Sequence, residues 1–156
     1  MSIADSLRDL HRGCNSCQSC QCVRGNCNLR LEDPDKVVCI DVDRCTAFSS
    51  NPEKKPDYII LDARDLASPR WVVVEMKVQI RGHPDEIVKQ LQEGARVIAE
   101  DRQFAVEVSR LVPLVLHEKG AHSQDVKSLQ KARVNFKGKS WPILVLRCGL
   151  SIGEVG

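Results

Sequence analysis

The run WVVVEMKVQI, residues 71–80, is apolar enough for a buried strand but carries two charges, Glu75 and Lys77, in its second half. Because strand side chains alternate between two faces, one face is entirely apolar: Val72, Val74, Met76, Val78 and Ile80. That face should pack on a helix. The other face begins apolar and turns polar: Trp71, Val73, Glu75, Lys77 and Gln79. A strand that only builds a core has no reason to bury two charges, so its end is a candidate site.

The preceding strand, expected at residues 58–63, brings another charge to the same place. A hairpin through the turn at 65–69, centred near residue 66, sets Asp57 opposite Glu75, with Lys77 beside them. Two carboxylates in contact repel, and one protonates unless a cation lies between them. Mg²⁺ or Mn²⁺, which take oxygen ligands, would relieve that repulsion. The alternative is a solvent-facing half-strand on which Glu75 and Lys77 form a surface ion pair.

The order of the remaining elements defines the fold class. Apolar spacing and breaker residues predict a helix at 2–12, a first strand at 36–43, and a helix from Pro84 to about residue 101. A strand at 110–118, a short helix at 123–132 and strands at 133–138 and 141–149 follow. This order predicts an α/β (α+β) protein in which helices flank a mixed central β-sheet. We divide it into a helix and Cys-rich segment, 1–33, and a main domain, 34–156.

Composition limits the partners and the compartment. A chain of 156 residues suits one core, and its formal net charge of +2 is too small for nucleic-acid binding through the overall field alone. Any such contact needs a local basic patch. No apolar run approaches the roughly 20 residues that span a bilayer, and the N-terminus lacks a signal pattern. We therefore expect no membrane partner and a cytoplasmic protein, with its thiols mostly reduced.

Five of the eight cysteines crowd into one segment: Cys14, Cys17, Cys20, Cys22 and Cys27. Thiolates two residues apart can hold a tetrahedral Zn²⁺, and a C-x₂-C-x₂-C run also occurs in iron–sulfur sites. We favour a small structural zinc knot, with an iron–sulfur cluster or free and paired thiols as alternatives. The second ligand pair would be Cys22 and Cys27 or Cys39 and Cys45, and Cys148 could add a distant ligand. Cys39 and Cys148 otherwise read as core residues.

The strand motifs resemble those of the PD-(D/E)xK nuclease superfamily. Pro56–Asp57 heads one strand, and Glu75–Met76–Lys77 ends the next; the similarity covers roughly residues 36–118. It implies the αβββαβ, restriction-endonuclease-like core. The C-terminal VNFKGKSWPILVLRCG is also similar to the tail of uncharacterised bacterial proteins with this core.

The resemblance also implies roles for these residues. Asp57 and Glu75 would bind Mg²⁺ or Mn²⁺, helped by the backbone carbonyl of Met76. Lys77 would orient or activate the attacking water and stabilise charge on the phosphate, and Gln79 would contact phosphate or water. Many relatives add an acid from the first helix, where this chain offers Asp5 and Asp9; Asp41 on the first strand is another candidate. His83, His117 and His122 receive no role.

The helix after the lysine offers candidate nucleic-acid contacts. RecB-type relatives carry a glutamine there and a tyrosine four residues later; this chain has Gln90, but Gly94 replaces the tyrosine. Gln90, Lys89 and Arg96 are the candidate phosphate contacts, against the simpler view that they are solvated helix residues.

Three functions follow from these patterns. The first is a metal-dependent nuclease that hydrolyses phosphodiester bonds, with DNA preferred to RNA as its substrate. The second is a catalytically inactive nuclease fold that binds nucleic acid or a protein. The third is an interaction protein whose metal-bearing cysteines matter most. A homodimer or a larger complex is compatible with each, because one chain of this size is small for extensive recognition.

Overall fold

The computed structural model describes residues 2–10, 18–19, 22–48 and 54–156. Within them, one sheet has six strands in the order β1 (Gln18–Ser19), β4 (Val37–Asp41), β5 (Tyr58–Asp62), β6 (Arg70–Lys77), β7 (Arg110–His117) and β10 (Leu144–Arg147). Strands β1, β4, β5 and β6 pair antiparallel, whereas β7 is parallel to both β6 and β10. The predicted mixed central sheet with helices is confirmed.

The helices of the described part of the chain are α1 (Ile3–Leu10), α2 (Pro84–Glu100) and α3 (Ser123–Lys131). Four short 3₁₀ turns, Val42–Arg44, Thr46–Phe48, Arg102–Phe104 and Ile152–Glu154, complete the helical structure of these residues. Helix α2 begins at Pro84 as predicted and buries its expected apolar stripe, Ile87, Leu91, Ala95 and Ile98. None of the helices described is long and apolar enough to cross a lipid bilayer.

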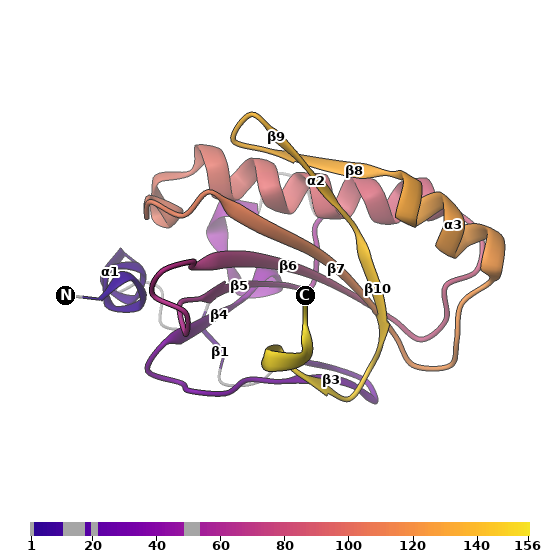
Figure 1. The fold of residues 1–156 in the computed structure, drawn as a ribbon, viewed down its shortest axis with the longest axis horizontal. Helices are drawn as coiled ribbons and strands as arrows, with labels where there is room; N and C mark the ends of the chain where they lie inside the picture. The colour runs from indigo at the N-terminus through magenta and orange to yellow at the C-terminus, as the bar shows by residue number, and fades with distance from the viewer. Residues whose placement is uncertain (1, 11–17, 20–21, 49–53) are drawn as a thin grey trace.

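Helix α2 covers one face of the sheet (Figure 1), and this is not the face of β6 that was predicted to pack on a helix. Trp71 and Val73 of β6 share a core with Leu91 and Ala95 of α2. The all-apolar face of β6, with Val72, Val74 and Met76, belongs to a second core together with the C-terminal segment. The prediction that this second face packs on a helix is wrong. Helix α2 packs on Trp71 and Val73, the apolar half of the face that also carries Glu75 and Lys77, and alternation alone does not say which layer covers which face.

The strand predicted to reach Ile80 ends at Lys77. Ile80 was expected beside Val72, but it packs in the first core with Trp71 and Val73. Residues 78–79 therefore break the alternation, and the strand pattern no longer determines the direction of Gln79.

Gly94 brings α2 unusually close to the sheet. A Cβ atom there would lie 2.6 Å from Val73 Cγ1 and 2.9 Å from Pro56 Cγ. Both distances are too short for carbon atoms in contact. A side chain as large as tyrosine could not occupy this position without moving the helix.

We expect Gly94→Ala to destabilise the protein by about 1–2 kcal/mol because the added methyl group overpacks the contact with Val73 and Pro56. At an exposed helix position the same substitution stabilises a protein by roughly 1 kcal/mol. The sign of the change in unfolding free energy therefore tells whether the contact at Gly94 is tight. Urea unfolding of both proteins measures the difference. A more stable variant would show that the close contact with Val73 and Pro56 is not rigid.

A second, three-stranded sheet lies over the other face and contains β2 (Cys22–Arg24), β3 (Cys27–Arg30) and β11 (Leu150–Ser151). Strands β2 and β3 form a hairpin through Gly25 and Asn26, and Gly25 has the positive φ (+57°) that such turns require. A disulfide joins Cys27 to Cys148 across 121 residues and ties this hairpin to the C-terminal segment. The sequence interpretation missed the hairpin.

The predicted strand at 141–149 is two strands. Strand β9 (Lys139–Pro142) pairs with β8 (Arg133–Phe136) in a separate hairpin beside α2 (Figure 1), whereas β10 joins the central sheet. Ile143, between them, is buried in the first core. The chain thus changes sheets at the position that the sequence showed as one continuous apolar run.

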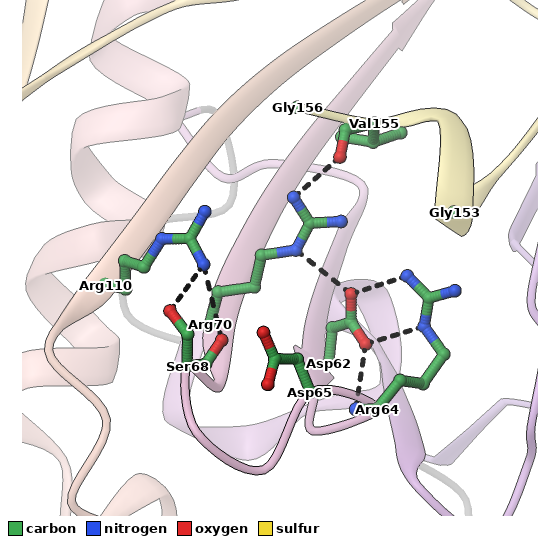
Figure 2. Close-up of a pocket in the computed structure, with 9 residues that line it drawn as sticks. All are labelled: Asp62, Arg64, Asp65, Ser68, Arg70, Arg110, Gly153, Val155 and Gly156. Atoms are coloured by element: carbon green, nitrogen blue, oxygen red, sulfur yellow. Dashed lines mark hydrogen bonds and ion pairs between the residues drawn. The ribbon is translucent and has the colours of Figure 1, made fainter.

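A hollow of about 390 Å³ lies at the end of β5, and the charged residues around it stabilise the fold (Figure 2). Asp62 accepts hydrogen bonds from Arg64 Nε at 2.8 Å and from Arg70 Nε at 3.0 Å. Arg70 also donates to the carbonyls of Ile152 and Val155, which fixes the C-terminal turn. Because Asp62, Arg64 and Arg70 are engaged with one another or with the backbone, we assign this hollow no chemistry.

Asp62 makes this cluster sensitive to acid. Burial alone would raise the pKa of Asp62, but the hydrogen bonds from Arg64 and Arg70 outweigh it and lower the pKa. A lowered pKa in the folded state adds stability above the unfolded-state pKa of about 3.9. That stability is lost as the pH falls through the lower folded-state value.

Asp62→Asn is therefore expected to cost about 2 kcal/mol at pH 7, and the difference from the wild type should shrink below about pH 4. Urea unfolding at pH 7 and pH 3 checks this. Equal losses at both values would mean that the carboxylate charge contributes nothing.

Candidate functional site

The strand pairing places Asp57 and Glu75 side by side at the other end of β5 and β6. Tyr58 pairs with Val74, so the next pair beyond the start of β5 is Asp57 and Glu75. The Asp57 N–H donates to the Val74 carbonyl at 2.9 Å, and the Met76 N–H donates to Asp57 Oδ2 at 2.7 Å. The register predicted from a hairpin centred near residue 66 is confirmed.

Glu75 is a buried acid rather than a solvent-facing one, with 3% of its surface exposed. Its Oε2 atom has no hydrogen-bond partner among the described residues, and Lys77 Nζ lies 3.8 Å from it. Burial, followed by the hydrogen bond with Asp57 and the Asp57 charge, raises the pKa of Glu75 to about 9. The metal-free pair therefore holds a proton at neutral pH, as two adjacent carboxylates should.

The oxygen atoms at this position suit a hard divalent cation. Asp57 and Glu75 supply carboxylate oxygens, and the unpartnered Glu75 Oε2 is a donor whose burial nothing else compensates. The Met76 N–H and the Val74 carbonyl both face β5, so the Met76 carbonyl faces the same side. Among the described residues no three or more His, Cys, Asp or Glu side chains form a metal-binding group, so such an ion would depend on two carboxylates, the carbonyl and water.

A hollow of about 240 Å³ adjoins the exposed end of Lys77. Three lysines and a single acid line it, together with one amide: Lys54, Lys77, Lys89, Glu86 and Gln90. The Gln90 Oε1 atom is buried and has no hydrogen-bond partner among the described residues. The fold thus gathers two predicted phosphate contacts, Lys89 and Gln90, around the predicted lysine, and it adds Lys54, which the sequence interpretation did not select.

The other predicted residues lie apart from this hollow. Arg96 forms ion pairs along its own helix with Glu93 at 2.5 Å and Glu100 at 2.7 Å. Its guanidinium is therefore engaged with carboxylates rather than facing the hollow. Gln79 is exposed and lines a different hollow with Arg81 and Lys119.

Asp5, one of the two candidate acids of the first helix, is engaged at its own helix. Asp5 accepts hydrogen bonds from Ser2 and Arg8 within and around α1. Arg8 in turn donates to the carbonyl of Val37, at the start of β4, whereas the site lies at the other end of that strand.

Among the histidines, His117 is nearest in the sheet because it pairs with Lys77. Burial, then the charge of Arg147, lowers the pKa of His117, and its Nδ1 atom has no hydrogen-bond partner in the described part of the chain. His83 lies at the start of α2 with a left-handed backbone and is exposed. His122 faces Asp125, with 3.9 Å between Nδ1 and Oδ2.

Arg24 is a site residue that the sequence interpretation missed. From strand β2 its guanidinium reaches Asp57 Oδ1 at 3.3 Å, Asp41 Oδ1 at 3.0 Å and Asp43 Oδ2 at 3.2 Å. Asp41, a predicted candidate for the third acid, is thus held beside Asp57 through an arginine. The Arg–Gly–Asn–Cys turn at 24–27 was the available signal, because it marks a hairpin that places Arg24 at a strand end.

The described cysteines form one disulfide and otherwise are free thiols, rather than the predicted metal-binding knot. Cys14, Cys17 and Cys20 lie outside the described residues, so the zinc or iron–sulfur hypothesis stays a prediction for them. Cys27 and Cys148 are bonded to each other, so the expectation of a reduced thiol or a plain core residue is wrong for this pair. Cys22 and Cys39 are buried free thiols whose Sγ atoms lie 2.8 Å apart.

Comparison with protein-family models, with curated proteins and with solved structures gave no significant match. Functional inference therefore depends on the geometry of the site and on the motif resemblance.

Proposed function

We propose that this protein is a divalent-metal-dependent nuclease that hydrolyses phosphodiester bonds, with DNA as its substrate rather than RNA. The observation that carries the proposal is the buried Glu75 carboxyl next to Asp57, with one oxygen unpartnered and Lys77 Nζ 3.8 Å away. A buried acid in that state is costly to the fold, and a bound divalent cation would remove the cost. The preference for DNA, and membership of the PD-(D/E)xK superfamily, follow from the motif resemblance and stay part of the proposal.

The residues of the candidate site have distinct roles in this proposal. Asp57 is oriented by the Met76 N–H, and with Glu75 it would hold Mg²⁺ or Mn²⁺. Such an ion, when bound, acidifies water and neutralises charge that develops on the phosphate. Lys77, half-buried between Glu75 and the lysine-lined hollow, would orient the attacking water and stabilise the same charge. Lys54 and Lys89 would hold neighbouring phosphates of the strand.

The test is a substrate panel. Purified protein is incubated with single-stranded DNA, double-stranded DNA and RNA, each with Mg²⁺, with Mn²⁺ and with EDTA. Metal-dependent cleavage of DNA is expected, and cleavage that continues in EDTA would refute the proposal. Binding without cleavage in every metal would instead favour an inactive nuclease fold that recognises nucleic acid.

A further inference from the structure

Arg24 contacts a group of three carboxylates that includes Asp57 of the candidate site. Its Nη2 atom lies between Asp41 Oδ1 and Asp43 Oδ2, and its Nε atom reaches Asp57 Oδ1. Asp57 therefore stands between two groups: its Oδ2 atom takes the Met76 N–H beside Glu75, and its Oδ1 atom takes the guanidinium. Arg24 thus contacts three carboxylates at once; of these, Asp41 also pairs with Arg44 and Asp43 with Lys55, whereas Asp57 pairs with Arg24.

The fold holds Arg24 firmly in this position. The guanidinium carbon lies 4.5 Å from the centre of the Tyr58 ring, and Nη1 donates to the Tyr58 hydroxyl at 2.7 Å. The same hydroxyl donates to the Val23 carbonyl at 2.8 Å, which fixes strand β2. Across the hairpin Arg24 pairs with Cys27, whose disulfide to Cys148 anchors the turn. A surface arginine on a loose strand would not show this set of contacts.

We propose, building on the proposed function, that Arg24 is a permanent second cation of the metal centre. Two-metal hydrolases hold a second ion beside the first; here a guanidinium bonds Asp57, which would hold the first ion. Arg24 is therefore a positioning residue that acts through Asp57. Its charge also repels an incoming divalent cation, so the protein binds that ion more weakly than the bare carboxylates would.

Electrostatics fixes the sign of the effect. Removal of one positive charge bonded to a ligand carboxylate favours a divalent cation by about tenfold in affinity, even with the high dielectric of a half-exposed site. Loss of structure would act in the opposite direction, because misplaced carboxylates bind metal less well. Tighter binding therefore separates the proposed role from simple damage to the fold.

The experiment measures Mn²⁺ binding to the metal-free full chain by electron paramagnetic resonance of free Mn²⁺, which needs no activity. The variants are Arg24→Gln and Arg24→Met, which remove the charge; methionine keeps an apolar contact with the Tyr58 ring and serves if the glutamine variant unfolds. Arg24→Lys keeps the charge. The matched control is Arg44→Gln, since Arg44 Nε lies 3.7 Å from Asp41 Oδ2 but its side chain is 67% exposed.

We expect Arg24→Gln and Arg24→Met to bind Mn²⁺ about tenfold more tightly, and Arg24→Lys and Arg44→Gln to stay within about threefold of the wild type. Unchanged or weaker binding by folded charge-removal variants, while the wild type binds Mn²⁺, would overturn this inference alone. A wild-type protein that binds no Mn²⁺ would overturn the proposed metal site and this inference together.

Discussion

Glu75→Gln and Lys77→Met are each expected to lower metal-dependent DNA hydrolysis by at least about 10³-fold, or roughly 4 kcal/mol in transition-state stabilisation. Glutamine keeps the shape of Glu75 but loses the anionic oxygen that a divalent cation needs. Methionine keeps the length of Lys77 but removes the ammonium group, which lies 3.8 Å from Glu75 and borders the hollow where phosphate would bind. Single-turnover cleavage of labelled DNA with saturating Mg²⁺ or Mn²⁺ measures both losses.

Matched controls separate these effects from a general charge change. Glu107→Gln and Lys131→Met make the same substitutions at exposed positions outside the site, and they should keep wild-type activity within about threefold. If the Glu75 and Lys77 variants cleave DNA as fast as these controls, the chemistry does not depend on this pair and the nuclease proposal fails.

The part of the site that sequence could predict is the part that one hairpin determines. The turn at 65–69 has few possible centres, and a centre near residue 66 sets Asp57 opposite Glu75, as the pairing of Tyr58 with Val74 confirms. A register error of one residue would have placed the two acids on opposite faces. The prediction succeeded because the two strands are adjacent in sequence and the turn between them is short.

Sequence patterns failed where contacts join distant segments. Arg24 reaches Asp57 from a strand more than thirty residues away, and Cys27 bonds Cys148 across 121 residues. Neither contact leaves a local periodic pattern. The cysteines near Cys27 in sequence suggested a metal knot, whereas the fold gives Cys27 a distant partner. The helix α2 was predicted accurately, yet the face it covers was not. The more apolar face of β6, with Val72 and Val74, packs against the C-terminal segment, and α2 packs on Trp71 and Val73 instead.

Glu75→Gln is also expected to stabilise the metal-free protein, by on the order of 3 kcal/mol at pH 8. The pKa of Glu75 is raised from its ordinary value of 4.5 to about 9 in the folded state. A raised folded-state pKa contributes stability that is fully present below the unfolded-state value and is lost as the pH rises toward 9. Glutamine does not titrate, so the variant escapes that loss, and its advantage over the wild type should grow between pH 5 and pH 8.

Urea unfolding in EDTA at pH 5 and pH 8 measures this growth, and any constant packing difference between glutamine and glutamate cancels in the comparison. Added Mn²⁺ should then stabilise the wild type, because a ligand that binds only the folded state shifts the equilibrium, but it should not stabilise the variant. A stability difference that is the same at both pH values would mean that the buried acid is already compensated within the fold. If Glu75→Gln stabilises the metal-free protein and also abolishes DNA cleavage, the Glu75 carboxylate serves to bind a cation rather than to pack the core.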